Sequence, residues 1–447
     1  MMLIDELLRK NGLSRRRFLR ALGLMAGATV LGSGLVLRGQ DVIKIGVLGP
    51  IKLFSFGQDM PRAVEFAIED IKELLGKKLQ MVMADTSGER DEDPRLAVQA
   101  AENLVNREGV KLLIGNFRSE AAVAVADLMP RLRVPYIITG ATDPGVTGKV
   151  AADYANFKYI FRVLLNGSFL AFDIVNLAAR FIRTELVEKG IITTNKVAVV
   201  AEDLLFTRPF SALLGSRLPQ LGFNLVANER VAIGADFDPT FAKLAAQLKA
   251  GESMTILTVF SVPQSALPFH NTWATLRFPA AVFGLNAAAL DPAFSAALLR
   301  ANPTAVGYTF QDIAEEVEIT PLTKAYFKRF TDKHGRRPVY TGVLTYDGTR
   351  IWAEAVNRAK TTDSDAVVAE LEKTKHTGVG GRYEFFSLTD AANDPQNLAK
   401  PHDPKYSAEF VYPVHVQIQQ GGKRAPVFGL GLDPKLASPY VKPPWLP

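Results

Sequence analysis

Two polar loops, each directly after a short apolar run, hold the residues best suited to binding an anion. Residues 112–115 are apolar and lead into a loop that ends at Ser119, where an Ala/Val-rich segment begins. A serine before an acidic residue and good helix formers is typical of a helix start, whose free N–H groups attract anions. The second run, 134–138, leads into a turn that contains Thr142. We predict an anion site at Ser119 and Thr142; the alternative is that both only cap helices.

The two loops meet only if the apolar runs are neighbouring strands of one sheet. Strand-like and helix-like segments alternate along the chain, beginning with an apolar strand at 41–50 and an amphipathic helix at 59–75. This alternation predicts an α/β fold with parallel sheets that are covered by helices on both faces. Because open sheets of this kind bind ligands at the carboxyl ends of their strands, we expect the ligand at these loops.

Length and composition indicate an ordinary globular protein with more than one lobe. The chain has 447 residues, of which 48% are hydrophobic and 22% charged, and it exceeds the usual size of a single core. A second series of strands and helices follows residue 160. The prediction is two doubly wound parallel-sheet lobes joined by three crossings, and the expected ranges are 41–160 with 311–378 for lobe 1 and 161–310 with 379–447 for lobe 2.

The first 40 residues have the pattern of an export signal. The segment SRRRFL at 14–19 resembles the twin-arginine motif, and a moderately apolar, glycine-containing run follows at 21–37. An uncleaved membrane anchor is the alternative, because this run is near the lower length limit for spanning a bilayer. We expect a twin-arginine signal peptide at 1–40 and a mature protein that is periplasmic or otherwise extracytoplasmic.

Charge and motif content argue against several classes of function. Most of the formal net charge of +6 lies in the first 40 residues, and no concentrated basic face for nucleic acid is visible in the remainder. The chain has no cysteines and its five histidines are scattered. It also lacks a phosphate-binding loop, a nucleophile elbow and a zinc-protease motif. We therefore predict no enzyme activity, no metal site, no cofactor and no nucleic-acid partner.

Several segments, taken in their order and spacing, resemble the periplasmic solute-binding proteins of ABC importers, of the leucine/isoleucine/valine-binding type. They include IGVLGP at 45–50, the segment 113–144 and TYDGTRIWAEAVNRA at 345–359. The resemblance covers about 42–428 and implies a type I periplasmic-binding-protein fold, whose two lobes close on a ligand and dock on a membrane permease. We expect a small organic ligand and ABC permease subunits as partners, and a monomer.

The resemblance also implies ligand contacts on the first lobe. In this family a serine at a helix start and a threonine in the following loop hold the α-carboxylate of the ligand. The matching positions are Ser119 and Thr142, together with the backbone of Gly140 and Ala141. Arg118 adds positive charge beside them in this interpretation, and a solvated surface arginine is the alternative.

Second-lobe positions depart from the family pattern. The acid that binds the α-ammonium in amino-acid binders is matched by Asn286, and an aromatic hydroxyl position holds Phe206. An amide is a weaker partner for a cation than a carboxylate. The predicted ligand is therefore a carboxylate, aromatic acid, amide or similar solute, and a branched-chain amino acid binder or a receptor's ligand-sensing module are the alternatives. Phe260 and Phe56 are also expected to line the cleft, with core packing as the alternative for Phe56.

Overall fold

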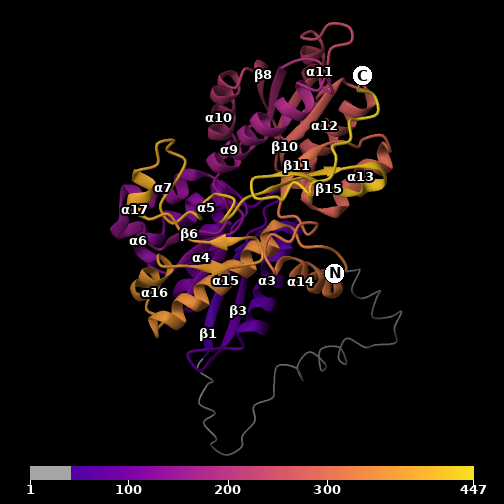
Figure 1. Ribbon diagram of the computed structural model, residues 1–447. Coiled ribbons are helices and arrows are strands. Elements are labelled where there is room, and N and C mark those ends of the chain that lie inside the picture. Colours follow the sequence, from indigo (N-terminus) through magenta and orange to yellow (C-terminus); the bar gives the residue numbers. More distant parts are fainter. Residues whose placement is uncertain (1–41, 447) are drawn as a thin grey trace, which may run out of the picture. The chain divides into compact units, whose positions relative to one another are not determined.

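The computed structural model describes residues 42–446 (Figure 1). The signal peptide expected at 1–40 lies outside the described residues. Within 42–446, no helix has the length and apolar character needed to cross a membrane. The predicted α/β fold with parallel sheets is confirmed by the strand pairing.

The first sheet has the strand order β2-β3-β1-β4-β5-β6, and every pair except β2–β3 is parallel. Its strands are β1 (Val42–Gly49), β2 (Glu73–Leu74), β3 (Lys77–Asp85), β4 (Leu112–Gly115), β5 (Tyr136–Ile138) and β6 (Ile160–Arg162). The pairing of Leu113 with Tyr136 makes β4 and β5 neighbours. The two apolar runs are therefore adjacent parallel strands, as predicted, and the loops after them share one sheet edge.

Helices cover both faces of the first sheet. Leu113 faces α4, beside Leu104, whereas the next residue of β4, Ile114, lies beside Gly348 of α15. This opposite orientation follows from the alternation of side chains along a strand. The helices of this part are α3 (Ser55–Ile71), α4 (Pro94–Asn106), α5 (Ser119–Ala126), α6 (Met129–Leu132), α7 (Pro144–Ala152), α8 (Tyr154–Phe157), α14 (Thr323–His334), α15 (Tyr340–Ala359) and α16 (Ser364–Leu371).

The second sheet has four parallel strands in the order β10-β9-β7-β8. They are β7 (Lys196–Glu202), β8 (Asn224–Val231), β9 (Met254–Phe260) and β10 (Ala280–Asn286). The helical segments of this part are α9 (Gly167–Leu177), the π-helical Ala178–Val187, α10 (Thr207–Gln220), α11 (Asp238–Ala245), α12 (Pro263–Thr275), the 3₁₀ turn Ala287–Leu290 and α13 (Pro292–Ala301). The all-buried pattern of β9 is typical of a parallel strand covered on both faces.

A third, antiparallel sheet has the order β11-β14-β15. Its strands are β11 (Thr309–Asp312), β14 (Val414–Ile418) and β15 (Arg424–Gly429), and the 3₁₀ turn Gln420–Gly422 joins the last two. The strands β14 and β15 thus form a hairpin. Short elements complete the chain: β12 (His376–Thr377), β13 (Arg382–Tyr383) and α17 (Leu388–Ala392).

The segment after β13 returns to the edge of the first sheet. The ring of His402 stacks on Phe161 of β6 with centroids 4.0 Å apart, and the backbone N–H of Arg162 donates to the carbonyl of His402 at 3.0 Å. Residues around 402 therefore pack on the first sheet, although the predicted boundaries assign 379–447 to lobe 2. The remaining lobe boundaries stay a prediction.

Candidate ligand-binding cleft

A cavity of about 110 Å³ lies between the carboxyl ends of the first and second sheets. Its wall includes the loops that follow β4, β5 and β6 on one side and residues after β7, β9 and within or after β10 on the other. The third sheet and the start of α15 complete it. The wall residues are Phe117, Arg118, Ser119, Gly140, Thr142, Val163, Leu164, Leu165, Leu170, Phe206, Ser261, Leu285, Ala287, Leu290, Gln311, Asp312, Ile313, Tyr340, Leu344, Val411, Tyr412 and Pro413.

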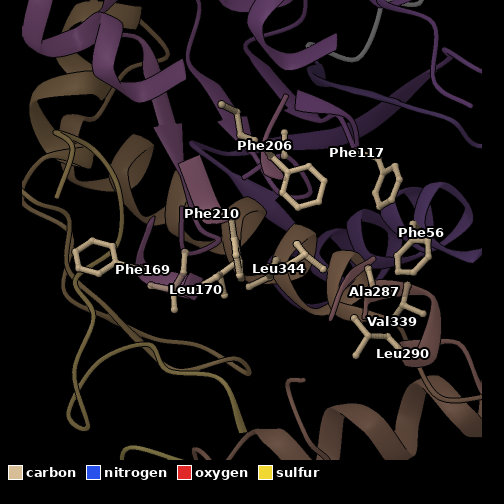
Figure 2. Close-up of a cluster of buried hydrophobic side chains, with 14 of the residues drawn as sticks. Phe56, Phe117, Phe169, Leu170, Phe206, Phe210, Ala287, Leu290, Val339 and Leu344 are labelled. Atoms are coloured by element: carbon tan, nitrogen blue, oxygen red, sulfur yellow. The ribbon is translucent and has the colours of Figure 1, made fainter. Parts of the chain in front are cut away.

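Most of this wall is apolar. Figure 2 shows Phe117, Phe206, Leu170, Leu290 and Leu344, which come from different elements and gather in one cluster of buried side chains. An apolar cavity with a few polar groups is typical of a site for a small organic molecule, because the apolar wall supplies affinity and the polar groups fix orientation.

Neither predicted hydroxyl caps a helix. Helix α5 begins at Ser119, and the preceding Arg118 stands in the cap position without a side-chain cap bond. The Oγ of Ser119 instead accepts a hydrogen bond from the backbone N–H of Asp143 at 3.1 Å. Asp143 caps α7, because its carboxylate accepts from the N–H of Gly145 at 2.8 Å. The hydroxyl protons of Ser119 and Thr142 have no acceptor among the described residues and are available to a ligand.

The loop after β5 is held close to the loop after β4. A side chain at Gly140 would place its Cβ 2.6 Å from the carbonyl oxygen of Asn116, so only glycine fits at this position. The hydroxyl of Tyr340 donates to the carbonyl of Gly140 at 2.9 Å. Ala141 is buried and does not line the cavity. Three of the four predicted first-lobe contacts, Ser119, Gly140 and Thr142, therefore share the cavity wall.

Arg118 is a buried cation at the cavity wall, so the alternative of a solvated surface arginine is wrong. Only 4% of the residue is exposed. Its Nε donates to Asp91 Oδ2 at 2.5 Å, and its Nη1 donates to Ser261 Oγ at 2.8 Å. Burial lowers the pKa of Arg118, but the bonds to Asp91 outweigh burial and the pKa is raised. Arg118 therefore stays charged beside the hydroxyls of the first lobe.

Asp312 is the sole carboxylate among the described residues that line the cavity. It accepts a hydrogen bond from Arg337 Nη2 at 2.9 Å and another from Arg424. Two guanidinium groups thus already bind Asp312, and the same two groups also contact Glu315 and Glu316. Within residues 42–446, no group of three or more His, Asp or Glu side chains is placed to hold a metal ion.

Two aromatic residues predicted to line the cleft lie behind its wall. Phe56 stacks on Phe117 with ring centroids 5.0 Å apart, and only Phe117 lines the cavity. Figure 2 shows the two rings side by side. Phe260 packs in a buried aromatic cluster, 5.2 Å from Phe269 between centroids. Core packing, the alternative for Phe56, describes both residues, whereas Phe206 lines the cavity as predicted.

Asn286 is buried but does not line the cavity either. Its Oδ1 accepts a hydrogen bond from the N–H of Ala289 at 3.2 Å and so caps the 3₁₀ turn after β10. The adjacent Leu285 and Ala287 are the wall residues. Asn286 therefore is not placed to contact a ligand's ammonium group, and the carboxylate of the cavity wall is Asp312.

The sequence did not single out several wall residues. Phe117 stands inside the predicted loop beside Ser119 but carried no chemical signal of its own. Ser261 directly follows β9 and Gln311 lies within β11, and neither residue carried a local signal that indicated a ligand contact. Tyr340 reaches the cavity from the start of α15. These contacts depend on pairing between distant segments.

Comparison with known proteins agrees with this geometry. A family model described as periplasmic binding protein matches residues 42–400. The Leu/Ile/Val-binding protein homolog 7 of Brucella suis biovar 1 (strain 1330) is 25% identical over 355 residues, which is 77% of this chain and 85% of that protein.

Solved structures share the fold. The branched-chain amino acid transporter substrate binding protein LivJ from Streptococcus pneumoniae, in complex with isoleucine, matches with a TM-score of 0.66 and 18% identity, over 86% of this chain and 97% of that chain. A solute binding protein of an ABC transporter from Rhodopseudomonas palustris BisB5, in complex with 3,4-dihydroxybenzoic acid, matches with a TM-score of 0.68 and 19% identity, over 90% and 99%. The type I fold is confirmed, and the chain belongs to the periplasmic binding protein family.

Proposed function

We propose that this protein captures a small organic carboxylate in the cavity between its lobes, outside the cytoplasm, and delivers it to the permease of an ABC importer. Family membership supports the binding and delivery roles. The ligands named for two structural relatives, isoleucine and 3,4-dihydroxybenzoic acid, have a carboxylate in common. The chemistry of the cavity wall is what carries the choice of ligand class.

The first-lobe side of the cavity supplies donors for an anion. The hydroxyls of Ser119 and Thr142 have free protons, and the first turn of α5 offers N–H groups at the positive end of the helix dipole. Arg118 adds a buried guanidinium, which is paired with Asp91 on one side. A carboxylate that accepts from these groups gains charge-assisted hydrogen bonds, which are stronger than neutral ones. This grouping of donors is the observation that carries the proposal.

The cavity wall is poorly suited to an α-ammonium group. An ammonium taken out of water needs an anionic partner. Asp312 already accepts from Arg337 and Arg424, and no other described residue of the wall is an acid. The favoured ligand is therefore an apolar acid without an ammonium group, held at its carboxylate by the first lobe and enclosed by aromatic and aliphatic side chains.

The binding proposal is tested by thermal unfolding of the purified protein with carboxylates, amides and amino acids. A ligand at one hundred times its Kd adds about 2.7 kcal/mol to the free energy of unfolding. The double variant Ser119→Ala/Thr142→Ala should lose the shift for every acid that stabilises the wild type. Ser216→Ala, an exposed serine of α10, is the matched control and should keep it. A full shift in the double variant would contradict the anion site.

We also propose export by the twin-arginine route, supported by SRRRFL at 14–19. The charge-conserving variant Arg15→Lys/Arg16→Lys should retain the protein in the cytoplasm, as measured by cell fractionation. Normal export of this variant would indicate another route.

A further inference from the structure

A second polar position borders the cavity, on a different sheet from the anion site. Gln311 is in β11 of the antiparallel sheet and lines the cavity beside Leu170 of α9. Only 6% of the residue is exposed. A buried amide must place both ends of its side chain against suitable partners, because an unpaired buried polar atom is costly.

The orientation of the Gln311 amide is fixed by its neighbours. Its Nε2 donates to the carbonyl of Leu170 at 3.0 Å and to Oδ2 of Asp173 at 2.9 Å. Both partners are acceptors, so a flipped amide would set its oxygen against two other oxygens. The amide nitrogen therefore faces α9, and the oxygen Oε1 faces away from these two acceptors.

Asp173 is itself held in place. It is fully buried and accepts from the Tyr406 hydroxyl at 2.9 Å, while its Oδ2 lies 2.7 Å from Nε2 of His415. His415 is the residue paired with Gln311 across the β11–β14 ladder. The carboxylate of Asp173 is thus fixed by three elements: α9, β14 and the segment at 406. It in turn fixes the amide of Gln311. Such a network preorganises a side chain at a binding site.

The oxygen Oε1 of Gln311 is buried and has no hydrogen-bond partner among the described residues. The cavity that Gln311 borders is the space from which a partner for this oxygen can come. A neutral amide oxygen is well matched to a neutral donor such as a hydroxyl. A desolvated ammonium with this single acceptor would lack the anion it needs.

We propose that Gln311 is a specificity-determining residue, which accepts a hydrogen bond from a hydroxyl group on the ligand, so that the ligand is a hydroxylated carboxylic acid. The inference rests on the proposed function, because the carboxylate is assigned to the Ser119 and Thr142 side of the cavity. The hydroxyl occupies a separate part of the ligand, at the side lined by β11.

Matched acids with and without a hydroxyl test this proposal by isothermal titration calorimetry. The probes are benzoate with 3- and 4-hydroxybenzoate, and hexanoate with 6-hydroxyhexanoate. In the wild type, a hydroxylated acid should bind about tenfold more tightly than its parent acid, because the parent leaves Oε1 unpaired. In Gln311→Leu this preference should fall to about twofold or less, since the acceptor is gone.

Gln417→Leu is the matched control, because Gln417 is a buried glutamine of the adjacent β14 that does not line the cavity. It should retain the preference for the hydroxylated acid. If parent and hydroxylated acids bind equally to the wild type, the role of Gln311 is overturned while carboxylate binding stands. Retention of the preference in Gln311→Leu would also overturn it. If no acid binds, the proposed function itself fails.

Discussion

Arg118, which precedes α5 beside the first sheet, donates a hydrogen bond from Nη1 to Oγ of Ser261, which follows β9 of the second sheet, at 2.8 Å. The backbone N–H of Ser261 donates to Glu202 Oε2 at 2.8 Å, and its hydroxyl donates to the same carboxylate. Ser55 and Asp291 form a second contact of this kind. The two sheets are thus linked directly at the cavity, as expected for lobes that have closed on one another.

Removing the cross-cleft acceptor should weaken ligand binding. In Ser261→Ala the Nη1 group of Arg118 loses its partner, and an unpaired buried donor costs about 1–3 kcal/mol. Because the bond links the two sheets, this cost falls on the closed state, and we expect a carboxylate ligand to bind about five- to tenfold more weakly. Titration calorimetry measures the Kd. Small-angle scattering without ligand should show a larger radius of gyration for Ser261→Ala than for the wild type. An unchanged Kd and radius would show that the contact does not support closure.

The pair Arg162–Asp403 should dominate the stability of the loop after β5. Nε of Arg162 lies 3.1 Å from Oδ1 of Asp403, and both side chains are fully buried. Arg162 Nη2 also donates to the carbonyl of Asp143 at 2.7 Å, next to Thr142. Asp403→Ala leaves a buried charge without its partner and should lower the free energy of unfolding by about 3–5 kcal/mol in urea titrations.

The control for this pair is an exposed one, Lys189–Glu185, one helical turn apart. Glu185→Ala should change the free energy of unfolding by less than about 1 kcal/mol, because exposed ion pairs contribute little. Equal losses in Asp403→Ala and Glu185→Ala would contradict the structural role of the buried pair.

Glu202 should give stability a dependence on pH. Burial raises the pKa of Glu202 above its ordinary value of 4.5, although the bonds from Ser261 and the charge of Arg118 act in the opposite direction. A raised pKa means that the folded state binds the proton more tightly than the unfolded state. Protonation of Glu202 therefore contributes to the free energy of unfolding. This contribution is fully present below pH 4.5 and is lost as the pH rises through the folded-state pKa.

Urea unfolding of the wild type and Glu202→Gln at pH 5 and pH 8 measures this contribution. The wild type should gain stability relative to the variant on going from pH 8 to pH 5, because the variant cannot take up the proton. If the free energies of unfolding of the two proteins differ by the same amount at both pH values, the pKa of Glu202 in the folded state is not raised.

Local patterns predicted the elements that build the anion side of the cleft. β4 and β5 are short apolar runs that end in polar loops, and this pattern also located the loops that carry Ser119 and Thr142. Helices α12 and α13 were not predicted. Pro268 inside α12 conflicts with helix propensity, and tertiary packing overrides that preference. For the same reason α3, with Pro61 inside, begins earlier than the predicted residue 59.

The second-lobe side of the site was harder to predict, because it depends on which face of a strand or turn meets the cavity. Leu285 and Asn286 are neighbours at the end of β10, and only Leu285 lines the cavity. A register shift of one residue exchanges such positions. Gln311 reaches the cavity through the pairing of β11 with β14, more than one hundred residues later in the chain, and no local pattern indicates that pairing.

We expect the cavity to bind a carboxylate without an α-ammonium group. Calorimetric titration with leucine and with 4-methylpentanoate, the same molecule without its amino group, tests this claim most directly. We predict that 4-methylpentanoate binds about tenfold or more tightly than leucine, because Asp312 already accepts hydrogen bonds from two arginines and no other described residue of the wall is an acid that could pair with the ammonium. Tighter binding of leucine would contradict the account and identify an amino-acid binder.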